Sequence, residues 1–169
     1  VLAMIRLYGE GLSRARAGVK KSMTGNKYKV ALDETWDLFG SLMSGARSGL
    51  VGVISAKPLS DAAQNAVNSS ARALGYGDDA CTFITTEGLE EHALFVLLEG
   101  LDPLCLVAAD GKTAALLGQA YRCSVPTGDA CRLFGRTAVS FIDFESLLQA
   151  PQDKQIAWAL LKKLPKLNS

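Results

Sequence analysis

The chain has 169 residues, which is enough for one domain with a full hydrophobic core. Apolar residues make up 49% of it and charged residues 21%, and the formal net charge is +1, so composition alone requires neither a nucleic-acid nor a membrane partner. No apolar run approaches the roughly 20 residues that cross a bilayer, and the first residues lack the pattern of a secretory signal. We therefore expect a cytoplasmic protein without a membrane partner.

The first part of the chain, residues 1–49, is basic and helical in pattern. In residues 1–32, seven basic residues stand against a single acid: Arg6, Arg14, Arg16, Lys20, Lys21, Lys27 and Lys29. They could contact phosphates or a partner subunit, but the near-neutral total favours a solvated helix face. Four apolar residues then recur at helical spacing: Trp36, Phe39, Leu42 and Met43. This spacing predicts a helix that begins at Asp33, in a segment that packs on the rest of the chain.

From residue 50 onward, short apolar runs alternate with helical patterns. The runs predict strands at 50–54, 81–85, 104–108 and 137–142. The patterns between and after them predict helices at 61–74, 89–101, 112–121 and 152–164. Strands that are continuously apolar, each followed by a helix, indicate a parallel sheet covered on both faces. We predict a three-layer α/β/α sandwich with a central parallel sheet of about four strands, in which residues 50–169 form the α/β domain.

In such sheets the ligand crevice lies beyond the carboxyl ends of the strands. The residues at those ends are polar, with one aromatic: Ser55, Lys57 and Pro58 after the first strand, Thr85 at the second, Asp110 and Lys112 after the third, and Asp143, Phe144 and Glu145 after the fourth. The sequence therefore predicts a polar cleft. Two simpler interpretations stay open: Asp143 and Glu145 cap a turn, and Asp110 only serves a strand-to-helix turn.

Metal and redox chemistry find little support in the sequence. The four cysteines are Cys81, Cys105, Cys123 and Cys131, and their spacing is not that of a zinc or iron–sulfur site. Two of them lie in apolar runs, where a thiol acts as a small hydrophobe. The single histidine, His92, follows Glu90 and Glu91 in a helical pattern, which favours a solvated helix face. We expect no metal and no other cofactor.

The end of the chain carries a resemblance to a known family. "FIDFESLLQAPQDKQIAWALLKKLPKL", residues 141–167, is similar to the carboxyl end of uracil-DNA glycosylases, particularly the family-4 type of bacteria and archaea. Leu147, Leu148, Pro151, Lys154 and Trp158 fit that pattern. "LDPLCLVAADGKTAALLG" and "VGVISAKPLSDAAQNAV" resemble two upstream motifs in the right order, so the resemblance spans about residues 50–165.

The resemblance implies a site and also shows where this chain departs from it. Asp143 stands at the family's catalytic histidine, Phe144 at its proline, Ala56 at its first-motif acid and Gln149 at an arginine. The cysteine ligands of the family's iron–sulfur cluster have no counterparts. A histidine donates to the leaving uracil, whereas an ionised Asp143 would repel the developing anion.

The size of that repulsion is large on the scale of catalysis. Two unit charges ~4 Å apart interact by about 4 kcal/mol at an effective dielectric constant of about 20. Each ~1.36 kcal/mol changes the rate tenfold, so we expect weak or absent uracil excision. Asp143 and Lys57 are the candidate catalytic residues, with Lys112 as an alternative cation.

The implied role is that of a uracil-DNA glycosylase-like DNA-repair protein that binds DNA or a nucleobase in this cleft. The candidate binding residues are Ser55, Pro58, Phe83, Thr85, Asp110, Lys112, Phe144 and Leu147. Phe144 or Phe83 would stack on the base. Leu147 and Leu148 occupy the place of the family's DNA wedge, although burial of at least one is favoured.

Two other functions stay open. One is a non-catalytic interaction protein that kept only the scaffold, with a homo-oligomer as one form of it. The other is an unrelated α/β enzyme that uses Lys57, Asp110 and Asp143 on a small anionic substrate.

Overall fold

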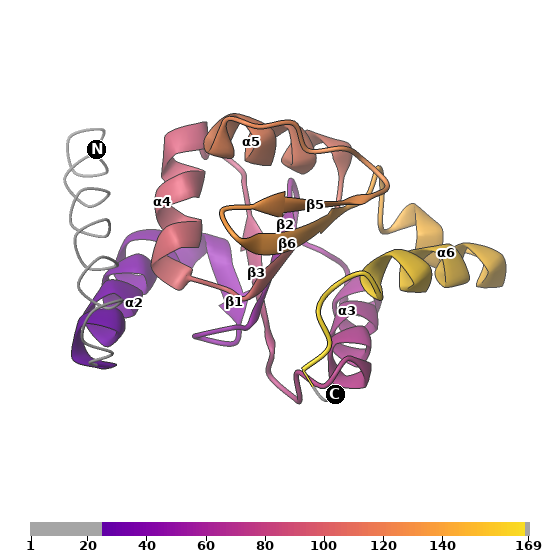
Figure 1. Ribbon diagram of the computed structural model, residues 1–169, viewed down its shortest axis with the longest axis horizontal. Coiled ribbons are helices and arrows are strands. Elements are labelled where there is room, and N and C mark those ends of the chain that lie inside the picture. The colour runs from indigo at the N-terminus through magenta and orange to yellow at the C-terminus, as the bar shows by residue number, and fades with distance from the viewer. Residues whose placement is uncertain (1–24, 168–169) are drawn as a thin grey trace.

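The structure, a computed structural model, describes residues 25–167 (Figure 1). The basic residues between Arg6 and Lys21 therefore lie outside the described residues, and the predictions for them stay predictions. None of the helices in the described part of the chain is both long and apolar enough to cross a bilayer.

A six-stranded mixed sheet forms the centre of the molecule. Its strands are β1 (Met43–Gly45), β2 (Val51–Ser55), β3 (Cys81–Thr85), β4 (Cys105–Ala108), β5 (Ala130–Leu133) and β6 (Arg136–Ser140), in the spatial order β1-β3-β2-β4-β6-β5. Strands β3, β2, β4 and β6 are parallel, whereas β1 and β5 pair antiparallel at the two edges. The predicted α/β class is confirmed, but the sheet is larger than predicted and is not purely parallel.

Helices cover both faces of this sheet (Figure 1). The helices are α2 (Gly25–Phe39), α3 (Asp61–Ala73), α4 (Glu91–Leu101), α5 (Gly111–Tyr121) and α6 (Pro151–Leu161), with short 3-10 turns η1 (Gly40–Leu42) and η2 (Ser146–Leu148). One buried cluster joins α2, α4 and α5 to the sheet, and a second joins α3 and α6 to its other face. The layers therefore follow the α/β/α order.

The central strands are buried on both faces, which explains their continuous apolar sequence. In β2, Ile54 belongs to the cluster under α4, while Val51 and Val53 belong to the cluster under α3. Successive side chains of a strand point to opposite faces, so a strand between two helical layers needs apolar residues at every position.

The helix predicted from Asp33 begins earlier and ends earlier than predicted. Helix α2 already starts at Gly25 and ends at Phe39, and Met43, predicted as helical, belongs to β1. Gly40 interrupts the periodic pattern, because glycine is a poor helix former, and the chain turns through η1 into the sheet edge. Residues 31, 32 and 39 pack into the cluster under α4, so this segment shares the core of the α/β domain.

The strand order places a switch point between β2 and β4. From β2 the chain passes through α3 to β3 on one side, then through α4 to β4 on the other side of β2. Helices α3 and α5, which follow β2 and β4, therefore lie on opposite faces, and the loops leaving these adjacent strands diverge. Such a point is where open α/β sheets bind their ligands.

Candidate functional site

A cleft of about 1240 Å³ lies at the carboxyl ends of β2, β3, β4 and β6. We call it the strand-end cleft. The predicted site residues among its lining are Ser55, Lys57, Pro58, Asp110, Lys112 and Asp143. Three separate strand ends thus deliver polar side chains to one hollow, as the sequence pattern predicts for a parallel sheet. Their roles in catalysis or binding stay predictions.

Asp110 is the most constrained of these residues. Its Oδ1 accepts a hydrogen bond of 2.7 Å from the backbone N–H of Thr113, so it is the N-cap of α5. Its Oδ2 accepts a second bond of 2.9 Å from the N–H of Ala56, in the loop after β2. One carboxylate therefore starts α5 and holds the two sides of the cleft together, which matches the simpler interpretation of a strand-to-helix turn.

The end of β6 is fixed beside the end of β4 by backbone bonds. The N–H of Gly111 donates to the carbonyl of Ile142 over 3.0 Å, and the N–H of Phe144 donates to that of Ala109 over 2.8 Å. An isolated antiparallel bridge pairs Asp110 with Asp143. These bonds bring Asp143 to the rim of the cleft.

Two further carboxylates at this rim are partly used by the fold. Asp143 Oδ1 accepts a bond of 3.3 Å from the N–H of Ser146, and the Ser146 hydroxyl donates to the Asp143 carbonyl over 2.9 Å. Glu145 accepts from both the N–H (3.3 Å) and the hydroxyl of Ser60, the N-cap of α3. Both acids thus stabilise turns, while Asp143 remains exposed to the cleft.

The two lysines of the cleft, Lys57 and Lys112, are its positively charged side chains. Lys57 follows β2 and Lys112 lies in the first turn of α5, and both are exposed. Neither forms an ion pair within residues 25–167. Each amine is therefore available to a ligand in the cleft.

Four predicted binding residues do not line the cleft: Phe83, Thr85, Phe144 and Leu147. Phe83 points into the cluster under α3, and Phe144 is almost fully buried with its ring 4.9 Å from that of Phe141. Thr85 turns toward η1, where its hydroxyl donates to the Leu42 carbonyl over 3.4 Å. The predicted stacking of a base on Phe83 or Phe144 is therefore not available in this arrangement, because both rings belong to the core.

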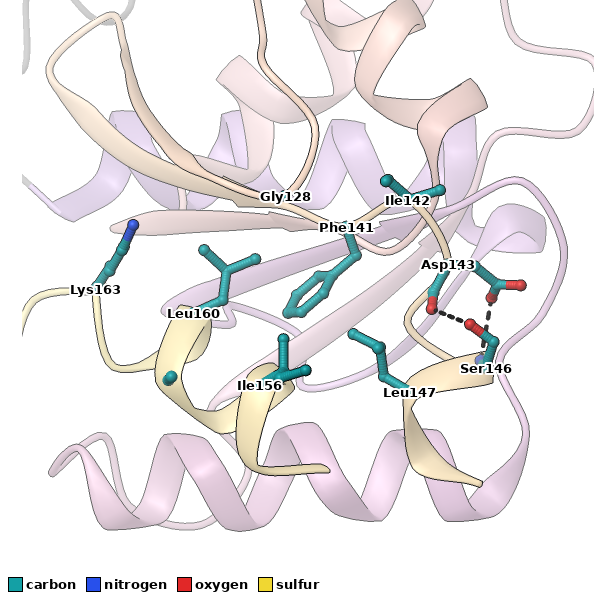
Figure 2. A pocket seen from close by; sticks show the side chains of 10 residues that line it. Gly128, Phe141, Ile142, Asp143, Ser146, Leu147, Ile156, Leu160 and Lys163 are labelled. Carbon is teal, nitrogen blue, oxygen red and sulfur yellow. Dashed lines mark hydrogen bonds between the residues drawn. The ribbon is translucent and has the colours of Figure 1, made fainter. Parts of the chain in front are cut away.

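Leu147 lies instead in an apolar groove beside the cleft (Figure 2). The groove has a volume of about 520 Å³ and runs between the end of β6, η2 and α6. Figure 2 shows the Phe141 ring between Leu160 of α6 and Leu147 of η2, with Ile156 closing the lower side. Leu147 and Leu148 both pack against the cluster under α3, so neither projects as a free wedge.

Ile142 is one of the cleft residues that the sequence reasoning missed. It lines both the groove and the strand-end cleft, and 72% of its surface is exposed. The sequence pattern made Ile142 the last residue of the predicted strand 137–142, because it ends the apolar run. In the structure β6 already ends at Ser140, so Ile142 lies beyond the sheet.

The described residues contain no group of three or more His, Cys, Asp or Glu side chains that could hold a metal ion. Cys81 and Cys105 are buried, and burial raises the pKa of the Cys81 thiol to about 12 and raises that of Cys105 as well. These two thiols are therefore protonated and act as core side chains.

The sequence matches no protein-family model and no curated protein. The similarity to uracil-DNA glycosylases consequently rests on the three sequence motifs alone.

Proposed function

We propose that the strand-end cleft binds a nucleobase, free or in DNA, in a protein of the uracil-DNA glycosylase type with an altered site. The observation that carries the proposal is the convergence of Lys57, Asp110 and Asp143 from three strand ends on one cleft at the switch point of the sheet. The order of the three similar motifs along the chain supports the same ligand.

The chemistry of the cleft suits a planar ligand with hydrogen-bonding edges. Lys57 and Lys112 supply donors, and the exposed carboxylates of Asp143 and Glu87 supply acceptors. Apolar side chains between them provide surface for a ring: Pro58, Leu59, Leu89, Leu116 and Ile142. A few polar groups set among apolar ones are the usual composition of a ligand site.

The proposed role is binding rather than rapid excision. Asp143, aligned with the family's histidine, is an acceptor with its Oδ1 already bonded to Ser146 N–H. An ionised carboxylate at this position has no proton to donate to a leaving uracil, and its charge opposes the anion that forms.

Calorimetric titration with uracil tests the proposal. We expect a measurable heat of binding that Lys57→Ala weakens, because that change removes a donor from the cleft. Lys166→Ala is the matched control, because Lys166 lies away from the cleft. The N–H of its neighbour Leu167 donates to the carbonyl of Leu74 at the carboxyl end of α3, whereas the cleft lies near the amino end of that helix. Absence of uracil binding by the unmodified protein would contradict the proposal.

Alkali treatment of uracil-containing single-stranded DNA after incubation reports excision, which we expect to be weak or absent.

A non-catalytic interaction protein is the second candidate function. It is favoured by the use of Asp110 and Glu145 for capping and loop attachment rather than for chemistry. Sedimentation of the full chain tests it: a stable homodimer together with no uracil binding would support this candidate over the first.

A further inference from the structure

The two helix starts at the strand-end cleft are already occupied by carboxylates of the protein itself. Helix N-termini attract anions because their first N–H groups have no partner within the helix. At α5 the Asp110 carboxylate binds Thr113 N–H and also the loop N–H of Ala56. At α3 the Glu145 carboxylate binds the N–H and hydroxyl of the N-cap residue Ser60.

These are the positions that a phosphate group takes in many α/β proteins. A phosphate at the start of α5 would have to displace Asp110, which makes two bonds of 2.7 and 2.9 Å. At the start of α3, where the Ser60 hydroxyl accepts from the Ala63 N–H, it would have to displace Glu145 from Ser60. Two carboxylates of the protein, those of Asp110 and Glu145, therefore act as built-in anions at the positions where a phosphate would bind.

The charge of the cleft lining acts in the same direction. Its lysines are Lys57 and Lys112, and its acids are Glu87, Asp110, Asp143 and Glu145. Carboxylates therefore outnumber amines in the lining, and an added anion meets net repulsion in the cleft.

We infer that the ligand of this cleft carries no phosphate group and is an uncharged, hydrogen-bonding ring compound of the nucleobase or nucleoside class. This inference rests on the proposed function, because it concerns the same cleft. It narrows the ligand from a base within DNA, or a nucleotide, to the free base or its nucleoside. The apolar surface of Leu89, Leu116 and Ile142 suits the ring and sugar of such a ligand.

The test compares uracil, deoxyuridine and deoxyuridine monophosphate by calorimetry on the full chain at one ionic strength. We expect deoxyuridine to bind about tenfold or more tightly than its monophosphate. Equal or tighter binding of the monophosphate would overturn the inference and leave the proposed function standing. Binding of none of the three compounds would overturn both, so the two failures are distinguishable.

Variants of the built-in anions give a second measurement. Glu145→Gln keeps an acceptor for Ser60 and removes one charge, so the ratio of nucleoside to monophosphate affinity should fall by about threefold or more. Asp78→Asn is the matched control, because Asp78 pairs with Arg72 near the far end of α3 and is not part of the cleft lining. An unchanged ratio in Glu145→Gln would contradict the inference. Circular dichroism confirms that each variant is folded.

Discussion

Asp110 at the end of β4 and Ala56 at the end of β2 are joined by a hydrogen bond of 2.9 Å from the Ala56 N–H to Oδ2. The two strands are neighbours in the sheet, but the helices that follow them lie on opposite faces. The same carboxylate caps α5 through Thr113. One side chain therefore sets the separation of the two walls of the strand-end cleft, and its loss should affect both stability and binding.

Asp110→Ala should lower the free energy of unfolding by about 2–4 kcal/mol. Loss of an N-cap costs about 1 kcal/mol, and the half-buried N–H of Ala56 loses its partner at a cost of about 1–3 kcal/mol. Urea denaturation measures the change. Asp110→Asn, which keeps an oxygen acceptor for the cap, should lose less, and equal losses in the two variants would contradict this account.

Arg136→Ala should be more damaging, although Arg136 lies away from the cleft. Its guanidinium donates 2.6 Å to Glu99 Oε2 and 2.7 Å to the Pro103 carbonyl, and the side chains of Arg136 and Glu99 are only 6% and 7% exposed. Removing the cation takes this ion pair from the buried Glu99 carboxylate, which costs about 3–5 kcal/mol.

The measurement is again urea denaturation, with Arg72→Ala as the matched control. Arg72 pairs with Asp78 at an exposed position, where an ion pair is worth about 0–1 kcal/mol. Similar losses in Arg136→Ala and Arg72→Ala would show that burial of the pair does not decide its contribution.

The four thiols should react with a thiol reagent in a fixed order. Cys123 is exposed and should react first. Burial raises the pKa of half-buried Cys131, so less of it is thiolate at pH ~8 and it should react more slowly. Cys81 and Cys105 should react only on unfolding. Peptide mapping of time-resolved alkylation checks the order, and early labelling of Cys81 would contradict the described core.

The pair of Lys163 and Asp129 predicts a small pH effect on stability. The hydrogen bond from Lys163, at 2.8 Å, lowers the pKa of the Asp129 carboxyl below its usual value. Because the folded pKa is depressed, the pair contributes at neutral pH and loses its contribution as pH falls below about 4.

Lys163→Met should therefore be less stable than the unmodified protein at pH ~6 and equally stable at pH ~2. Both groups are more than half exposed, so we expect a small difference. Thermal unfolding at a series of pH values measures it. A difference that is constant across this range would exclude the ion pair as its cause.

Strands buried on both faces could be predicted from the sequence, and edge strands could not. β2 and β4 show unbroken apolar runs because each has a helical layer on either side. β1 has only three residues, including a serine and a glycine, and carries too little pattern to predict a strand. β5 returns to β6 through Phe134 and Gly135, both with positive φ (+49° and +83°). Arg132 and Arg136 on either side interrupt the apolar pattern that would indicate the two strands of this hairpin.

The cleft residues could be predicted where they depend on topology alone. The carboxyl ends of parallel strands share one edge, so Lys57, Asp110 and Asp143 could be placed together. The aromatic residues could not, because the direction of Phe144 depends on the turn dihedrals after β6. Its buried position follows from the backbone bond to Ala109, which no local pattern encodes.

Ile142 should matter for ligand binding and not for folding. It lines the cleft and is 72% exposed, so Ile142→Ala removes little buried surface from the free protein. Loss of its contact with a bound ring should weaken uracil or deoxyuridine affinity about fivefold, or about 1 kcal/mol.

Ile156 is the matched control, since it is 58% exposed in the groove but does not line the cleft. Calorimetry should show a lower affinity in Ile142→Ala and no change in Ile156→Ala. If both isoleucine variants lose affinity equally, the ligand extends into the apolar groove, and if neither does, the ring does not contact this rim of the cleft.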